Sequence, residues 1–231
     1  MKIIEFNGLP GCGKTTISKA LFSSMLRQGI FPVYYNDIHL KFPSKIRERV
    51  THIFKHWNFR EIQCLHRISR CFKKIPFREK WMRVLYAEQI ASNYRAFQSE
   101  EKICIADQGL VQAVISIGYT HDFKSAASKN DFVKFSSEFL GPYFDQVIIV
   151  NTQVAPRESL KRLRSREKNY GRFDSIASDS VLLSSLQKQE ELFQFLRDGC
   201  LVNKNVIYLN SSDSPVENVV RIVEYVTEKD C

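Results

Sequence analysis

The sequence has 231 residues, 44% of them hydrophobic, and a formal net charge of +9. This predicts one globular domain, residues 1–231, because no Pro/Gly/Ser-rich linker or internal repeat divides the chain. It argues against a membrane-spanning protein, since no apolar run is long enough to cross a bilayer, and the six cysteines include no C-x-x-C pair of the kind that zinc sites use. We therefore expect a cytoplasmic protein with reduced thiols.

A phosphate-binding loop follows the first predicted strand, Lys2–Asn7. Residues 8–15 read G-L-P-G-C-G-K-T, which fits the pattern G-x-x-x-x-G-K-[ST]. In this pattern backbone N–H groups grip a polyphosphate, the Lys14 ammonium bridges the outer phosphates, and the Thr15 hydroxyl holds a Mg²⁺ ion at the start of a helix. The sequence therefore predicts a nucleoside triphosphate site formed by Gly8, Pro10, Gly11, Cys12, Gly13, Lys14, Thr15 and Thr16.

Four further apolar runs alternate with stretches of helical character. They are Pro32–Asn36, Ile103–Asp107, Gln146–Val150 and Val206–Asn210. This alternation predicts an α/β fold whose parallel sheet is covered by helices on both faces. Because ligands gather at the carboxyl ends of the strands in such a sheet, the polar residues at those ends are candidate site residues.

Two aspartates stand at such strand ends. Asp107 closes the third strand as a Walker B acid does, and we expect it to hold Mg²⁺ directly or through water; the alternative is a helix N-cap. Asp37 follows the second strand. We expect it to accept the proton of an attacking hydroxyl or to hold the acceptor near the γ-phosphate, and an ordinary helix cap is again the alternative.

The positive charge is concentrated in residues 41–102. This segment holds fifteen Lys and Arg against six Asp and Glu, and the surplus of nine equals the net charge of the whole chain. It lacks glycine and has apolar residues at helical spacing, which predicts a helical insertion after the second strand. Its charge suits an anionic substrate, a nucleic acid or an acidic membrane face; the alternative is a set of core helices with a solvated basic face.

Residues 157–174 are dense in arginine and run from a predicted helix into a loop. Planar guanidinium groups suit phosphoryl transfer because its transition state spreads charge over several oxygens, and a closing loop excludes water. We expect this segment to be a lid whose catalytic arginines are Arg162, Arg166 and Arg172. The alternative is a solvated helix in which Glu158 pairs with Arg162.

These features together resemble the thymidylate kinase-like and deoxynucleoside kinase-like branch of the P-loop kinases. The resemblance rests on the phosphate loop, the Asp-ended third strand, the arginine-rich lid and the turn at residues 210–212; it spans the sheet and the lid but not residues 41–102. It implies the strand order 2-3-1-4-5, ATP with Mg²⁺ as donor, an acceptor beside Asp37 and an adenine site near the last strand's loop. One position departs from the family, which usually has an arginine where this chain has Gln108.

The sequence thus predicts a P-loop kinase that moves the γ-phosphoryl group of ATP to a small acceptor: a nucleotide, a nucleoside or a sugar-like molecule. The charge of residues 41–102 favours an anionic acceptor. Two other classes stay open, an NTP-hydrolysing module that grips nucleic acid through this segment and a kinase that acts on polynucleotide ends. Basic, aromatic helices are also compatible with packing in a homodimer.

Overall fold

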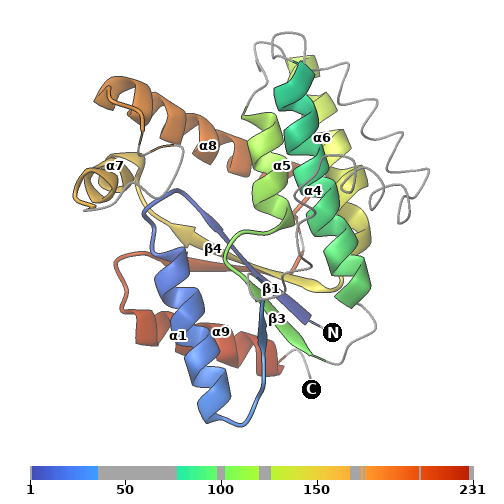
Figure 1. Cartoon of the computed structure of the whole chain (residues 1–231), viewed down its shortest axis with the longest axis vertical. Coiled ribbons are helices and arrows are strands. Elements are labelled where there is room, and N and C mark those ends of the chain that lie inside the picture. Colours follow the sequence, from blue (N-terminus) through green and yellow to red (C-terminus); the bar gives the residue numbers. More distant parts are fainter. Residues whose placement is uncertain are drawn as a thin grey trace.

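The centre of the protein is a parallel sheet of five strands in the order β2-β3-β1-β4-β5 (Figure 1). The computed structural model describes residues 2–35, 77–97, 102–119, 126–166, 173, 175–202 and 204–228. The strands are β1 (Lys2–Gly8), β2 (Val33–Tyr34), β3 (Ile103–Ala106), β4 (Val147–Gln153) and β5 (Val206–Asn210). The predicted fold class and the strand order that the family resemblance implied are both confirmed.

The register of the sheet explains one difference from the prediction. Ile4 of β1 lies opposite Ile105 of β3 and Ile148 of β4, so apolar residues meet across the centre of the sheet. The apolar run that predicted the fourth strand ends at Val150, yet β4 continues to Gln153. Its polar residues still pair through their backbones with the end of β1 and with β5, and backbone pairing does not require apolar side chains.

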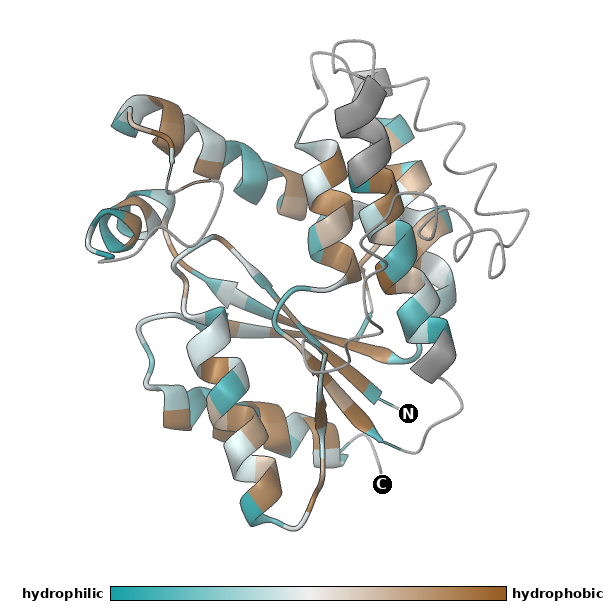
Figure 2. Ribbon diagram, in the orientation of Figure 1, coloured by the Kyte–Doolittle hydropathy of each residue, from teal (hydrophilic) through white to brown (hydrophobic). Residues whose placement is uncertain are grey.

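Helices cover both faces of the sheet (Figures 1 and 2). α1 (Lys14–Arg27) and α9 (Pro215–Glu228) lie on one face, where Ile4 and Phe6 of β1 are buried. The other face is covered by α4 (Phe77–Phe97), α5 (Leu110–Gly118), α6 (Ala126–Leu140) and α8 (Asp179–Gly199), and a short 3-10 helix, η2 (Gly141–Tyr143), follows α6. Both faces of the sheet are thus buried, which is the expected arrangement for a parallel sheet.

One helix, α7 (Pro156–Arg164), lies against the phosphate loop rather than on a face of the sheet. A small apolar cluster joins Leu9 of the loop, Leu163 of α7, Phe173, and Leu182 and Leu186 of α8. Burying one such side chain contributes roughly 1.5–3 kcal/mol. The predicted lid is therefore packed onto the loop through its helical half.

The helical insertion is described in part. α4 accounts for residues 77–97 and begins directly after Pro76. The remaining residues of the predicted insertion up to residue 76 lie outside the described residues. Within the ranges that are described, every helix is too short or too polar to span a membrane.

Candidate active site

The phosphate loop has the backbone of an anion-binding turn. Gly11 and Gly13 have φ values of 82° and 93°, in the region that favours glycine. Gly8, with φ 140°, also approaches its neighbours closely: a Cβ there would overlap the carbonyl oxygen of Thr152 and lie 2.9 Å from the Cys12 sulfur. The loop is therefore built tightly against the end of β4.

Lys14 is buried at the base of the loop, with 9% of its surface exposed. Its Nζ donates hydrogen bonds to the carbonyl oxygens of Gly8 (2.8 Å) and Leu9 (2.9 Å), and lies 3.6 Å from the Cys12 sulfur. The two carbonyl oxygens are uncharged, and the first turn of α1 has no acidic residue. The ammonium charge and the positive end of the helix therefore act together on an anion at this point.

Asp107 and Thr15 meet at the carboxyl edge of the sheet. The Thr15 hydroxyl donates a hydrogen bond of 3.1 Å to Oδ2 of Asp107. The N-cap of α5 is Gly109, so the alternative of Asp107 as the cap residue of that helix is not what forms. A hydroxyl beside a carboxylate fits Mg²⁺, which takes few protein ligands and fills its other positions with water and phosphate oxygens. In the described ranges no group of three or more His, Cys, Asp or Glu gathers as a metal site.

A cavity of about 610 Å³ opens beside Lys14. The phosphate loop and the start of α1 form part of its lining. Neutral polar side chains from α4, α5 and α8 form another part. Its lining includes Pro10, Gly11, Gly13, Lys14, Thr15, Thr16, Tyr86, Gln108, Gln112, Ser116, Tyr119, Arg166, Phe173 and Gln189.

Two amides of this lining have unsatisfied polar atoms. The Oε1 atoms of Gln112 and Gln189 are buried and accept no hydrogen bond. Gln189 is 6% exposed. Because buried polar atoms are nearly always paired in folded proteins, these two amides are candidates for contact with a bound molecule.

The predicted lid arginines occupy different places. Arg166 lines the cavity, and a Cβ on Gly11 would lie 3.7 Å from its Nη2. Arg162 lies behind the loop, where its Nε contacts Glu158 at 3.1 Å and its Nη1 lies 3.5 Å from the Gly11 carbonyl oxygen. The pairing with Glu158 is the one that the alternative interpretation anticipated. Asp37 and Arg172 lie outside the described residues.

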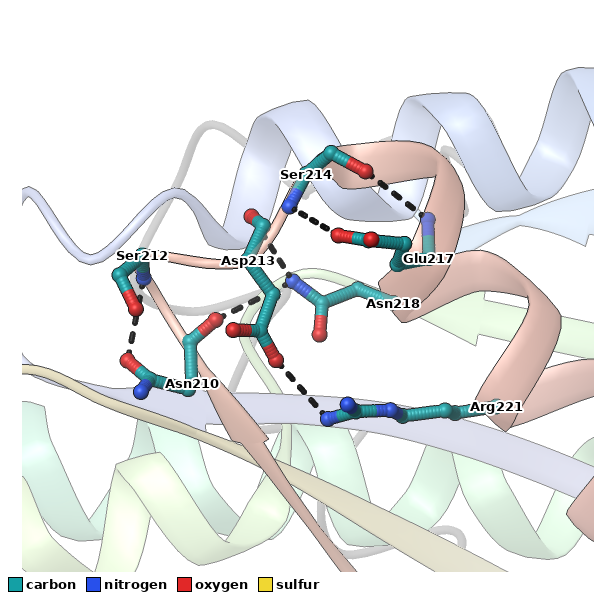
Figure 3. A network of polar contacts seen from close by, with 7 residues as sticks. All are labelled: Asn210, Ser212, Asp213, Ser214, Glu217, Asn218 and Arg221. Atoms are coloured by element: carbon teal, nitrogen blue, oxygen red, sulfur yellow. Dashed lines mark hydrogen bonds and ion pairs between the residues drawn. The ribbon is translucent and has the colours of Figure 1, made fainter.

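The turn after β5 is held by a network of short-range contacts (Figure 3). Oδ1 of Asn210 accepts from the Ser212 amide at 3.1 Å, and the buried Asn218 side chain donates to the Asn210 carbonyl oxygen at 3.2 Å. Ser214 and Glu217 form a capping box at the start of α9, which holds the pKa of the exposed Glu217 below its usual range. This is the turn where the family resemblance implies an adenine site.

A second cavity of about 440 Å³ lies beside the first and shares Ile115 and Gln189 with it. Amide side chains from three strands line it together with α8. Among them, Asn7 donates to Oδ1 of Asn151 at 3.0 Å. The sequence patterns did not predict this cavity, because its residues come from five separate elements, β1, β4, β5, α5 and α8.

Glu5 is a buried carboxyl group that the sequence patterns did not single out. It stands in the apolar run of β1 and is 0% exposed. Burial raises its pKa to about 7, although hydrogen bonds from Val111, Tyr94 and Leu110 act in the opposite direction. The signal was an acidic residue inside a strand that is buried on both faces. Burial also raises the pKa of Tyr86, and the negative charges of Asp107 and Glu5 add to this rise.

The raised pKa of Glu5 predicts that the free energy of unfolding falls as pH rises. The folded protein keeps a proton between the ordinary pKa of 4.5 and about 7, whereas the unfolded chain has lost it, so ionisation costs stability in that window. Relative to Glu5→Gln, the wild type should lose about 2–3 kcal/mol between pH 5 and pH 8 in urea titrations. Parallel curves for the two proteins would contradict this expectation.

Comparison with known proteins agrees with the fold. No family model and no curated protein matches the sequence. Among solved structures, a deoxyadenosine kinase from M. mycoides with the products dCMP and dCDP aligns with a TM-score of 0.54 and 12% identity over 98% of this chain and 99% of its own. The same kinase with bound dATP aligns with a TM-score of 0.54 and 15% identity, over 97% of this chain and 99% of its own. The YorR protein of Bacillus subtilis, in complex with phosphorylated GDP, aligns with a TM-score of 0.51 and 12% identity, over 99% of this chain and 98% of its own. The chain therefore has the P-loop fold of deoxynucleoside kinase-like proteins.

Proposed function

We propose that this protein is an ATP-dependent kinase that transfers the γ-phosphoryl group to a hydroxyl of a nucleoside-like acceptor. The observation that carries this proposal is the 610 Å³ cavity, whose lining combines the phosphate loop with neutral hydrogen-bonding side chains. Such a cavity can hold two reactants side by side. The fold that the chain shares with nucleotide-binding kinases supports the same class of reaction.

The donor end has the groups that ATP with Mg²⁺ requires. Lys14 and the N-terminus of α1 supply positive charge for the β- and γ-phosphates. Thr15 and Asp107 would hold Mg²⁺. When bound, Mg²⁺ neutralises charge on the phosphate oxygens. Arg166 is in a position to contact the transferring phosphoryl group, because it lies beside Gly11 and lines the cavity.

The acceptor end favours a neutral ligand. Lys14 and Arg166 are the basic side chains among the described lining residues, and both lie at the loop. The unpaired oxygens of Gln112 and Gln189 suit N–H or O–H donors, which a nucleobase and a sugar both carry. The charge of residues 41–102 predicted an anionic acceptor, and most of this segment lies outside the described residues.

The remaining roles follow from the sequence. Asp37 would accept the proton of the attacking hydroxyl or hold that hydroxyl in line with the γ-phosphate, and Arg172 would join Arg166 on the transferring group. Arg162 has a different proposed role. Through Glu158 and the Gly11 carbonyl oxygen it would hold α7 against the loop, and so keep Arg166 near the phosphates.

Incubation with ATP, Mg²⁺ and a pooled library of nucleosides, nucleotides and sugars tests this proposal. We expect mass spectrometry to detect a phosphorylated nucleoside, which is absent when Lys14→Ala replaces the wild type. A phosphorylated nucleotide would support the proposed kinase activity but contradict the proposal that the acceptor is neutral. ADP release that rises with RNA or DNA, without a small-molecule product, would favour the NTP-driven nucleic-acid module instead.

A further inference from the structure

The first turn of α5 has an unusual hydrogen-bond partner. Gly109 is the N-cap and has no side chain to accept from the free N–H groups of that turn. The Glu5 carboxylate, from β1, accepts them instead: Val111 N at 2.7 Å, Leu110 N at 2.9 Å and Gln112 N at 3.4 Å. A strand more than a hundred residues earlier in the sequence thus supplies the cap that a Ser or Asp at the N-cap supplies in most helices.

A second contact fixes the same carboxylate. The Tyr94 hydroxyl of α4 donates to Oε2 of Glu5 at 3.1 Å, and Tyr94 is itself fully buried. Tyr35, Tyr86 and Cys104 are titratable groups that interact electrostatically with Glu5 or Tyr94, and Asp107 acts on Tyr86. The carboxylate therefore joins β1, α4 and α5 at one point behind the cavity.

Gly109 leaves room for this contact. Its φ of −128° is extended backbone that any residue adopts, so the backbone does not require glycine here. Glycine is required here for lack of space, because a Cβ at Gly109 would overlap the Glu5 side chain and the Tyr94 hydroxyl. The approach of α5 to β1 is thus set by the carboxylate on one side and the missing side chain on the other.

Both ends of the proposed reaction depend on this junction. β1 runs from Glu5 directly into the phosphate loop, while α5 carries the cavity residues Gln112 and Ser116 and starts just after Gln108. We propose that Glu5 is a positioning residue, whose buried carboxylate sets where the α5 wall of the acceptor site lies relative to Lys14. This inference rests on the proposed function, because it treats that wall as the acceptor side.

Glu5→Gln tests the inference with little change of shape. The NH₂ group of the introduced amide would face a backbone N–H, so at least one hydrogen bond to the first turn of α5 is lost. We expect kcat/KM for the acceptor to fall about tenfold or more, while KM for ATP stays within about twofold, since a displacement of about 1 Å is enough for such a loss. Gly109→Ala places a methyl group against the same contact from the α5 side. It should likewise lower kcat/KM for the acceptor while KM for ATP changes little.

The two substitutions should not act independently. Because both disturb one contact, the double variant should lose much less than the product of the two single effects. Ile222→Ala, at a buried position of α9, is the matched control: it should lower the melting temperature without touching α5, and both KM values should stay unchanged. Equal losses for ATP and acceptor, or losses that Ile222→Ala reproduces, would overturn the inference.

Amide hydrogen exchange measures whether Glu5 holds the first turn of α5, and it does not depend on enzymatic activity. In Glu5→Gln the amides of Leu110, Val111 and Gln112 should exchange faster, while those of α1 keep their protection. If the wild type phosphorylated no acceptor, the proposed function would fail, and exchange alone would then decide whether Glu5 holds α5. Unchanged protection in the first turn of α5 would show that it does not.

Discussion

Lys14→Ala should lower kcat/KM for phosphotransfer by at least about 1,000-fold, which corresponds to roughly 4 kcal/mol of lost transition-state stabilisation. Lys14 is the buried cation at the base of the phosphate loop, and its hydrogen bonds there go to uncharged carbonyl oxygens. Its removal takes away charge where negative charge is transferred, without leaving a buried anion behind. Steady-state kinetics with saturating Mg²⁺, together with ATP titration calorimetry, measure this effect.

Lys19→Ala is the matched control, because Lys19 is an exposed lysine on the same helix, five residues further on. It removes the same charge and should leave both kinetics and ATP affinity unchanged. Thermal unfolding of Lys19→Ala should stay close to the wild type, since alanine suits a helix interior. Equal activity in Lys14→Ala and Lys19→Ala would rule out the phosphate loop as the donor site.

Asp107→Asn should reduce turnover by about 100-fold and raise the Mg²⁺ concentration needed for half-maximal activity. The substitution keeps the shape of the side chain, and its amide oxygen can still accept the Thr15 hydrogen bond, so the fold should persist. What is lost is the negative charge that holds a divalent cation. Activity measured over a series of Mg²⁺ concentrations gives both quantities.

Asp131→Asn, on the exposed side of α6, controls for the loss of one negative charge from the protein. It should leave the Mg²⁺ dependence unchanged. A lowered melting temperature in Asp107→Asn with an unaltered Mg²⁺ dependence would assign a structural role to Asp107 and leave the metal to other residues.

The sheet and the phosphate loop were predictable because their signals are local in the sequence. Five short apolar runs alternate with helical stretches, and the loop pattern occupies eight consecutive residues. The end of β4 was misjudged, since Asn151 and Thr152 pair through their backbones while their side chains look like a loop. The strand order came from the family resemblance and agrees with the structure.

The acceptor wall was not predictable in the same way. Gln112 and Gln189 are 77 positions apart and belong to no motif, yet they line one cavity. Glu5 was overlooked because one acidic residue in a strand looks like ordinary inside–outside alternation, and its partners on α5 lie about 105 positions away. The alternative role of Asp107 as the N-cap of the next helix was wrong, because the first amides of that helix donate to Glu5, which is distant in the sequence.

The position of β1 has a consequence for the way the protein loses structure. β1 is bonded to strands on both sides, whereas β2 is a two-residue strand at the sheet edge. Central strands open only with global unfolding, while edge strands open locally at a much lower free energy. The phosphate loop is thus attached to a strand that is paired on both sides, in the part of the sheet that unfolds last. Mild destabilisation should therefore open the edge of the sheet at β2 before it disturbs the phosphate loop.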